Sequence, residues 1–405
     1  MPFRIALSGL NAATADLNVT ANNIANSNTA GFKSSRAQFA DVFAVGSTDF
    51  RSNQIGNGVR LSKIAQQFAQ GNISFTDSNL DLAVNGTGFF TLHDNSGYTY
   101  TRNGSFGVDR NGFVVNDKNQ RLQVYPALAG GGFNTGTLTD LSLQTTQSPP
   151  QATTSGVVSV NLPASATAPS VAVFDPTDPQ SYNNSTSTSV YDSLGNLYTA
   201  TLYFIKGAAP NAWSVGMTVD GTQVGGTIPL GFNSTGQLTT PAGGAVTFPA
   251  FTPPGGANPI NMTFDFSQST QFGDTFAVNT LTQDGFSSGR LTGIDIDSTG
   301  VVFARFTNGR ATQLGQLALS NFPNPQGLRQ LGDTTWGETF DAGTVVRGAP
   351  GSASFGQIQA GALEESNVDL TKELVNMITA QRAFQANAQM ITTADQITQT
   401  IINIR

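Results

Sequence analysis

Apolar side chains recur at alternating intervals of four and three residues along the start of the chain. The positions that follow this spacing are Phe3, Leu7, Leu10, Thr14, Leu17, Ala21 and Ile24. Such spacing places side chains on one face of an α-helix and is typical of a coiled-coil seam. The pattern predicts a helix over residues 3–25, roughly 33–35 Å long at 1.5 Å per residue.

A second helix is indicated near the C-terminus, where Ser366, Asn367 and Asp369 offer capping oxygens directly before a periodic run. One apolar stripe of this run consists of Leu370, Leu374, Met377, Phe384, Ala388 and Ile391. A neighbouring stripe consists of Met390, Ala394, Ile397, Ile401 and Ile404. One interpretation is that the two terminal helices only pair within one chain. Because the second stripe widens the apolar face, we expect the pair to pack against further copies of the chain as well.

Strand signals replace helical periodicity between about residues 71 and 360. Three segments, at residues 108–114, 191–197 and 296–302, share a turn pattern in which an Asp is followed three residues later by a Gly. The Asp side chain accepts backbone N–H groups of such a turn, and Gly tolerates a positive φ. Further hairpin candidates are Asn85-Gly86, Asn103-Gly104, Asp220-Gly221 and Asn308-Gly309.

These signals predict a mainly β fold with terminal α-helices and nested, discontinuous domains. The insertion is inferred because one stretch is rich in Ala, Thr, Pro and Gly, while the segments on either side of it resemble each other. The expected parts are a coiled-coil domain (1–30 and 363–405), a partly irregular linker (31–70), a split β domain (71–145 and 285–362) and an inserted β domain (146–284).

Composition narrows the functional classes. The 405 residues carry a net charge of −7 with only 11% charged side chains, which argues against nucleic-acid partners and anionic membranes. Cysteine is absent, so disulfides and thiolate metal sites are excluded. We expect no membrane insertion, because no apolar stretch is long enough to span a bilayer. We also expect no cleaved signal peptide, because Ser8-Gly9 interrupts the first apolar run.

Catalytic patterns are present only in fragments. The single histidine, His93, lies in a segment that reads as an exposed turn. Residues 285–289 match G-x-S-x-G, but the sequence that follows is strand-like, whereas a nucleophile elbow requires a helix. Residues 295–300 begin like a calcium loop, but Phe306 stands where a bidentate Glu is required. We therefore predict no enzyme activity, metal or cofactor.

The asparagine-rich end of the first helix belongs to a recognisable signature. Ser8-Gly9-Leu10, Asn22-Asn23-Ile24-Ala25-Asn26 and Gly31-Phe32-Lys33 resemble the N-terminal motif of the bacterial flagellar axial proteins, which form the rod, hook and hook–filament junction. The C-terminal motif is similar too, with Ser366-Asn367-Val368-Asp369-Leu370 as its centre. Leu82–Phe90, Tyr100–Phe106 and Asn321–Leu328 resemble the common β core of the same family.

The resemblance implies a structural subunit that is exported through the type III apparatus and polymerises beneath a cap, outside the cell. Implied partners are copies of itself, the flagellar rod, the hook cap, the hook–filament junction proteins and the export apparatus. The insertion at residues 146–284 favours a hook subunit, part of a curved, flexible tube that acts as a universal joint between motor and filament. A distal rod-type subunit is the alternative, and a secreted carbohydrate binder or hydrolase is a more remote one.

The terminal helices are the expected polymerisation interface. Its predicted residues are Leu7, Leu10, Leu17, Asn22, Asn23, Ile24, Asn26, Leu370, Leu374, Met377, Phe384, Ile391, Ile397 and Ile401. The family motif residues are Gly31, Phe32, Lys33, Ser366, Asn367, Val368 and Asp369. We expect the Asn22, Asn23 and Asn26 amides to hydrogen-bond across subunits, because buried polar groups need partners. The alternative is an intrachain helix cap. Asn28 and Gly31 are expected to end the helix, since both tolerate a left-handed conformation.

Overall fold

The computed structural model describes residues 2–43, 56–128, 130–143, 147–352 and 354–403, with the side chains of residues 2, 401 and 403 outside that description. The fold is mainly β with one long α-helix near each end, as the sequence predicts. The chain divides into two compact units. The first comprises Met1–Gln144, Gly293–Ala304 and Ala311–Arg405, and the second comprises Thr145–Thr292 and Arg305–Arg310. The four-part domain division predicted above stays a prediction.

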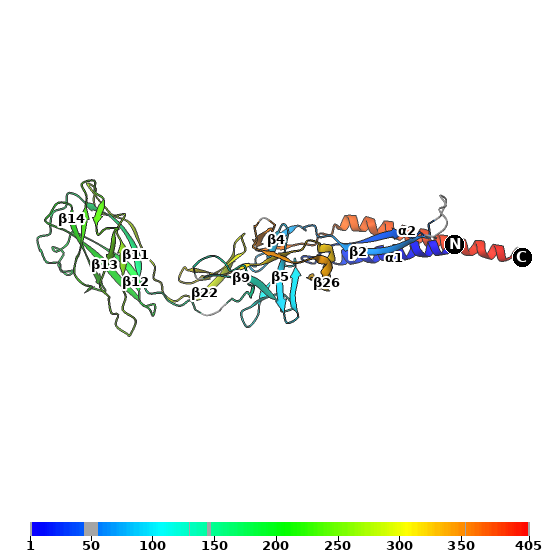
Figure 1. The fold of residues 1–405 in the computed structure, drawn as a ribbon, viewed down its shortest axis with the longest axis horizontal. Helices are drawn as coiled ribbons and strands as arrows, with labels where there is room; N and C mark the ends of the chain where they lie inside the picture. Colours follow the sequence, from blue (N-terminus) through cyan, green and yellow to red (C-terminus); the bar gives the residue numbers. More distant parts are fainter. Residues whose placement is uncertain (1, 44–55, 129, 144–146, 353, 404–405) are drawn as a thin grey trace. The chain divides into compact units, whose positions relative to one another are not determined.

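The two terminal helices of the first unit are α1 (Pro2–Ala25) and α2 (Leu370–Asn403). They lie side by side, and both chain ends are at the same end of the pair (Figure 1). The predicted cap of α2 is confirmed, because Asp369 Oδ1 accepts the backbone N–H groups of Thr371 and Lys372 at 2.9 and 3.2 Å. Among the described residues, no helix is both long and apolar enough to cross a membrane.

The expected irregular linker contains regular structure. Strands β1 (Ser35–Asp41) and β2 (Val59–Gln66) form an antiparallel ribbon with a register shift between Gln38 and Phe39. Both strands pack on α1. The ribbon was missed because β1 shows no clean alternation of apolar and polar residues, and alternation is the signal by which strands are recognised. The parts of the linker at residues 46–48 and 54–55, from which irregularity was inferred, lie outside the described residues.

The β part of the first unit consists of two short strand pairs and one large sheet. Its buried core includes Leu82, Phe90, Leu92, Val124 and Leu319. The pairs are β3 (Ile73–Phe75) with β30 (Ala362–Glu364) and β4 (Leu82–Asn85) with β29 (Gln357–Ala360). The sheet runs in the order β22 (Leu291–Ile296), β23 (Val301–Phe306), β24 (Ala311–Leu317), β9 (Arg121–Pro126), β5 (Phe89–Asp94), β6 (Gly97–Thr101), β27 (Thr335–Gly337), β26 (Arg329–Gly332). Attached to it are β7 (Gly107–Val108), β8 (Val114–Val115), β10 (Thr139–Asp140), β25 (Leu319–Asn321) and β28 (Val346–Gly348), with short 3-10 helices η1 (Pro325–Gly327) and η2 (Phe340–Ala342) nearby in the chain.

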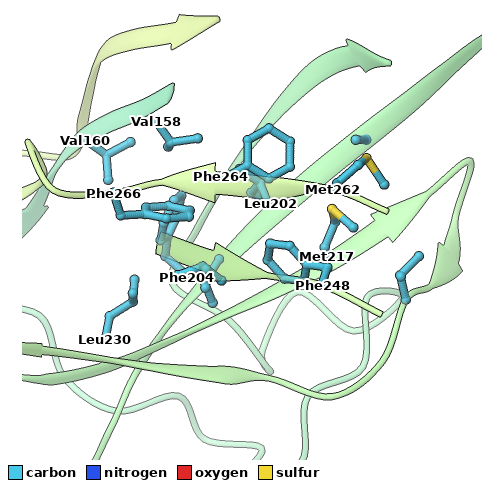
Figure 2. Packing of buried hydrophobic residues seen from close by; sticks show 14 of the residues in the cluster. Val158, Val160, Leu202, Phe204, Met217, Leu230, Phe248, Met262, Phe264 and Phe266 are labelled. Atoms are coloured by element: carbon cyan, nitrogen blue, oxygen red, sulfur yellow. The ribbon is translucent and has the colours of Figure 1, made fainter. Parts of the chain in front are cut away.

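The second unit is built from two sheets around one hydrophobic core. Figure 2 shows part of this core, in which the Phe204, Phe264 and Phe266 rings lie among aliphatic side chains and methionines. One sheet contains β18 (Ala245–Thr247), β19 (Thr263–Asp265), β11 (Ser155–Pro163), β20 (Thr270–Phe272) and β21 (Ala277–Gln283). The other contains β12 (Asn184–Tyr191), β13 (Leu197–Lys206), β14 (Ala212–Val219), β15 (Thr222–Gln223), β16 (Ile228–Phe232) and β17 (Leu238–Thr240).

All three predicted Asp–Gly turns are confirmed. Asp109, Asp192 and Asp297 each accept two backbone N–H groups of their own turn through Oδ1. The glycine three residues later has φ of 82°, 84° and 75°, respectively. Of the dipeptide candidates, Asp220-Gly221 joins β14 to β15 as a two-residue hairpin.

Two other dipeptide candidates, Asn85-Gly86 and Asn103-Gly104, are not hairpin turns. The strand β4 that ends at Asn85 pairs with β29 rather than with the next strand in the chain. A Cβ atom on Gly104 would lie 1.6 Å from the Leu82 carbonyl oxygen, so this glycine permits a close approach of two backbones instead. His93 also differs from expectation, because it lies within strand β5 and not in a turn.

Candidate assembly surface and its polar anchor

The predicted apolar seam of α1 is not the face that the helix buries. The buried side chains include Ala6, Ala13 and Thr20, whereas Phe3 and Leu7 are 52% and 41% exposed. Three further apolar residues of the predicted seam are half-buried, namely Leu10, Leu17 and Ile24. The physical reason is that α2, β1 and β2 all pack on α1, and small side chains allow such close approach. The large side chains of the predicted seam are therefore left partly exposed to solvent.

The α2 helix divides its apolar residues in a similar way. Met377, Phe384 and Ile391 are half-buried with a fully buried Ala380 among them. A second group of apolar side chains on this helix is exposed, namely Leu370, Leu374, Val375, Ile378, Met390 and Ile397, each between 46% and 59%. The side chain of Ile401 lies outside the described residues. The single chain thus leaves a broad apolar surface on α2 uncovered.

The asparagines at the end of α1 make their hydrogen bonds within the chain. Asn23 is 1% exposed, and its amide both donates to Ser35 O and accepts from Ser35 N, each at 2.8 Å. Asn26 donates to Asn22 O at 2.9 Å and accepts from the Thr29 hydroxyl at 3.2 Å. The Asn23 amide thus already binds the start of β1. The intersubunit hydrogen bonds expected for the three asparagines stay a prediction.

The helix end also differs in detail from the prediction. The helix stops at Ala25, and of the two residues expected to end it only Gly31 adopts a positive φ, of 69°. A Cβ atom on Gly31 would lie 2.4 Å from Asn103 N, so this glycine also admits a neighbouring backbone. Gly31 N donates to Glu364 O at 2.7 Å, which brings the N-terminal and C-terminal motifs into direct contact.

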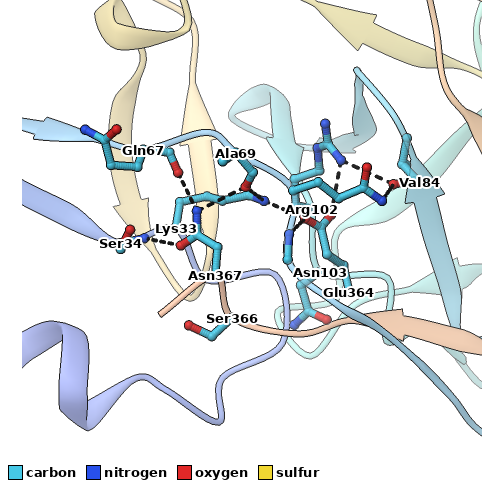
Figure 3. Close-up of polar contacts among 12 residues, drawn as sticks. Lys33, Ser34, Gln67, Ala69, Val84, Arg102, Asn103, Glu364, Ser366 and Asn367 are labelled. Carbon is cyan, nitrogen blue, oxygen red and sulfur yellow. Dashed lines mark hydrogen bonds and ion pairs between the residues drawn. The ribbon is translucent and has the colours of Figure 1, made fainter. Parts of the chain in front are cut away.

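A buried ionic cluster lies at this contact (Figure 3). Lys33 Nζ and Arg102 Nη1 both donate to the Glu364 carboxylate, at 2.5 and 3.1 Å. The Glu364 side chain is fully buried, as is that of Lys33, and that of Arg102 is 6% exposed. Glu364 Oε1 accepts a third hydrogen bond from Gly71 N at 2.9 Å. Two cations therefore share one carboxylate in a site closed to water.

Burial dominates the electrostatics of this cluster. Loss of solvation lowers the pKa of Lys33, and the nearby Glu364 carboxylate opposes that shift. Loss of solvation likewise lowers the pKa of Arg102, again against the effect of Glu364. The Glu364 carboxylate thus offsets the free-energy cost of burying both cations, since an unpaired buried charge is strongly destabilising.

Asn367 extends the cluster to the base of the ribbon. Its Oδ1 accepts from Ser34 N at 2.7 Å, and its Nδ2 donates to Gln67 O and Ala69 O at 2.7 and 3.0 Å. Lys33 Nζ donates to the same Ala69 carbonyl at 2.9 Å (Figure 3). The remaining motif residues lie in the same stretch, with Phe32 and Val368 half-buried, Ser366 buried and Asp369 capping α2. The arrangement can fix these chain segments relative to one another.

Comparisons with known protein families match four stretches of the chain. Residues 3–33 match the flagella basal body rod protein family, and residues 359–404 match the C-terminal family of flagellar basal body rod FlgEFG proteins. Residues 83–173 match the D1 domain of flagellar hook protein FlgE/F/G. Residues 161–286 match the D2 domain of flagellar basal body protein FlaE.

Relatives that match over the full length identify the family more specifically than these partial matches do. The flagellar hook protein FlgE of Salmonella typhimurium is 39% identical over 420 residues, covering 100% of both chains. That of Escherichia coli is 39% identical over 417 residues, again with 100% coverage of both. The chain belongs to the flagellar hook protein family. The flagellar hook protein FlgE of Borreliella burgdorferi, 33% identical over 98% of each chain, extends the relationship.

The match to full-length hook proteins favours the hook assignment over the rod-type alternative, because it extends through the region expected to be inserted. The fold agrees as well. The crystal structure of Helicobacter pylori flagellar hook protein FlgE2 aligns with a TM-score of 0.53 at 15% identity, covering 72% of this chain and 100% of that one. At that identity the similarity concerns the fold alone.

Sequence reasoning did not identify the partners of Lys33 in this hook-family chain. Arg102 lies in a stretch that resembles the family's β core, and Glu364 lies two residues before Ser366 of the C-terminal motif, but nothing in the sequence paired them. Along the chain, Glu364 lies 331 residues from Lys33 and 262 residues from Arg102. The signal that could have identified them is the scarcity of charged residues, which make up 11% of the chain. A Lys and an Arg inside otherwise uncharged motifs indicate a buried counter-ion.

Proposed function

We propose that this hook-family chain is a structural subunit that polymerises through α1 and α2 into a tube outside the cell. Its partners are copies of itself, and at the ends of the tube the flagellar rod, the hook cap and the hook–filament junction proteins. Export proceeds through the type III apparatus. The subunit has no catalytic role in this proposal, and the tube transmits torque from the motor to the filament.

The apolar surface of the terminal helices carries this proposal. Phe3 and Leu7 on α1 and Leu374, Val375 and Ile378 on α2 are each at least 41% exposed. Exposed apolar surface that is contiguous along a helix normally marks a protein interaction site. Because α1 already packs on α2 through a different set of residues, the exposed set is available to other copies.

Bending of the tube requires neighbouring subunits to slide past one another. The second unit offers an uncharged outer surface on β12 and β13, where Ser185, Ser187, Ser189 and Thr199 are exposed. Hydroxyl groups such as the Ser187–Thr201 pair, 3.0 Å apart, can exchange partners at little cost. Ion pairs would fix one register, so their scarcity on these strands suits a joint that must flex.

Point substitutions test the helical interface better than truncation does. A deletion of residues 363–405 would remove Glu364 and leave Lys33 and Arg102 buried without their carboxylate. Leu7→Asp and Leu374→Asp place a charge on the exposed apolar surface instead. We expect both variants to stay folded by circular dichroism and to lose polymers in negative-stain electron microscopy.

The matched controls are Asn18→Asp and Gln381→Asp, which add the same charge at exposed polar positions of the same helices. These controls should polymerise. Equal polymer yield from all four variants would remove the helices from the interface. In cells that lack the gene, electron microscopy should show rods without hooks, and an arrest before the distal rod would contradict the hook assignment.

A further inference from the structure

The last turns of α2 have no helical partner among the described residues. The helix has 34 residues against 24 in α1. The two run antiparallel, because Gly9 packs on Asn387 while Val19 lines the same groove as Asn376. In this register α2 continues past the start of α1, as Figure 1 shows at the red end of the ribbon. We call residues 395–403 the α2 extension.

The α2 extension is almost uncharged and exposes two isoleucines. Ile397 and Ile402 are 56% and 66% exposed. Its one charged side chain, Asp395, accepts a hydrogen bond from Gln399 within the helix at 3.1 Å. The other described side chains are hydroxyl and amide groups. Such a surface suits a partner that offers both apolar contacts and hydrogen-bond acceptors.

A groove with these properties lies toward the other end of the same helical pair. It has a volume of about 530 Å³ and runs between α1, β1 and the first turns of α2. Val19 and Phe39 supply apolar walls, and Asp16 and Asn376 supply polar ones. The charged side chains in the lining besides Asp16 are Arg36, Lys372 and Glu373. Within the described part of the chain, no group donates a hydrogen bond to the Asp16 carboxylate, although that side chain is half-buried. The Asp16 carboxylate can therefore accept hydrogen bonds from a segment that enters the groove.

We propose that the α2 extension of one copy docks into this groove of the next copy. The extension cannot reach the groove of its own chain, because Val19 lies roughly 25 Å along the helix from the start of α1 at 1.5 Å per residue. The isoleucines would contact Val19 and Phe39, and amide or hydroxyl donors of the extension would face Asp16. Because donor and acceptor surfaces differ, a docked pair still has one free groove and one free extension. Such a head-to-tail contact propagates into an open filament when the rotation between copies does not close a ring. This inference rests on the proposed function, since it specifies one contact of the polymer.

Disulfide trapping tests the contact directly, because the chain contains no cysteine of its own. In the full-length chain, Ile397→Cys is combined with Asn376→Cys, and independently Ile402→Cys with Phe39→Cys. Polymers are formed, oxidised mildly and run on a non-reducing gel. We expect a ladder of dimers, trimers and higher multimers from the double variants, and no ladder from either single variant. The matched control combines Ile397→Cys with Val346→Cys, an exposed position on β28 outside the groove, and should give no ladder.

The outcomes separate this inference from the proposed function. Polymers that form but give no ladder with either pair would overturn the docking contact and leave polymerisation intact. Crosslinking that stops at dimers would also overturn it, because it indicates a closed, symmetric contact. If the unsubstituted chain forms no polymer at all, the proposed function fails and this inference with it. Ile397→Asp should reduce polymer yield to background while Gln381→Asp, at an exposed polar position of α2 outside the extension, retains it. Equal yields would count against docking.

Discussion

Removing the negative charge of Glu364 should destabilise the first unit severely. The carboxylate accepts from Lys33 Nζ, Arg102 Nη1 and Gly71 N at 2.5, 3.1 and 2.9 Å. The substitution Glu364→Gln preserves the shape of the side chain but replaces one acceptor oxygen with an NH₂ donor. That donor would face groups that are themselves donors, and two buried cations would be left without an anion.

The expected loss of unfolding free energy follows from the composition of the cluster, in which one carboxylate compensates two cations. Removing the one partner that compensates a buried charge costs about 3–5 kcal/mol, which is a large fraction of the ~5–15 kcal/mol that stabilises a typical domain. Lys33→Met should cost less, about 2–3 kcal/mol for its two lost hydrogen bonds to Glu364 and Ala69 O, because no cation is left without an anion. After that change Glu364 still pairs with Arg102 and Gly71 N, and the net charge of the cluster falls from positive to zero.

Tryptophan fluorescence can follow the first unit alone. The chain has two tryptophans, and Trp336, which donates to Gln66 Oε1 at 2.7 Å, lies in the first unit. In a Trp213→Phe background, urea unfolding would report on Trp336 only. We expect Glu364→Gln to unfold at markedly lower urea than Lys33→Met. Equal losses from both variants, or a loss below about 1 kcal/mol for Glu364→Gln, would refute the argument that the carboxylate compensates two charges.

Three further outcomes follow from local geometry. Asn23→Leu should lower the thermal midpoint of the monomer, because two backbone groups of Ser35 lose their hydrogen-bond partner, at a cost of about 1–3 kcal/mol each. Impaired assembly of a monomer with an unchanged midpoint would instead support the intersubunit role. Gly31→Ala should destabilise by more than about 1 kcal/mol in the same melt, because φ is positive and the new Cβ would meet Asn103 N, and an unchanged midpoint would contradict that geometry. Burial raises the pKa of Tyr100 from 10.0 to about 12. The folded state then holds a proton that the unfolded state has lost, so stability should fall as pH rises between these values. Tyr100→Phe should reduce that fall and remove the latest phenolate signal in an absorbance titration. A Phe variant with unchanged alkaline behaviour would contradict the assignment.

Local chemistry explains which parts of the fold were predictable. The turns at Asp109, Asp192 and Asp297 are held by hydrogen bonds that span two to four residues. All the residues that determine each turn are therefore neighbours in the sequence. The cap of α2 by Asp369 is equally local. A fourth turn of the same kind, in which Asn233 Oδ1 accepts from Thr235 N and Gln237 N, was missed because the pattern was sought with Asp alone.

Long-range contacts explain what was not predictable. The period of the α1 pattern is right, but the buried face is offset from the predicted one. Which of two adjacent seams becomes buried depends on the partners, and the ribbon β1–β2 that covers α1 was not recognised. Asn23 illustrates the consequence: an amide that reads as an interface residue in a bare helix is occupied once Ser35 is brought beside it.

We expect the different burial of small and large side chains on α1 to separate folding from assembly in this protein. α1 buries Ala6, Ala13 and Thr20 within its own chain and leaves Phe3 and Leu7 partly exposed. Since burying a large apolar side chain contributes about 1.5–3 kcal/mol, the stronger hydrophobic contribution of this helix is still unused in the single chain. Substitutions of the exposed side chains should therefore change polymer yield with little effect on monomer melting, whereas substitutions in the Lys33–Glu364–Arg102 cluster should change melting first. An exposed-site variant that melted as early as a cluster variant would mean that the large residues already support the monomer, and the surface could then no longer be assigned to assembly.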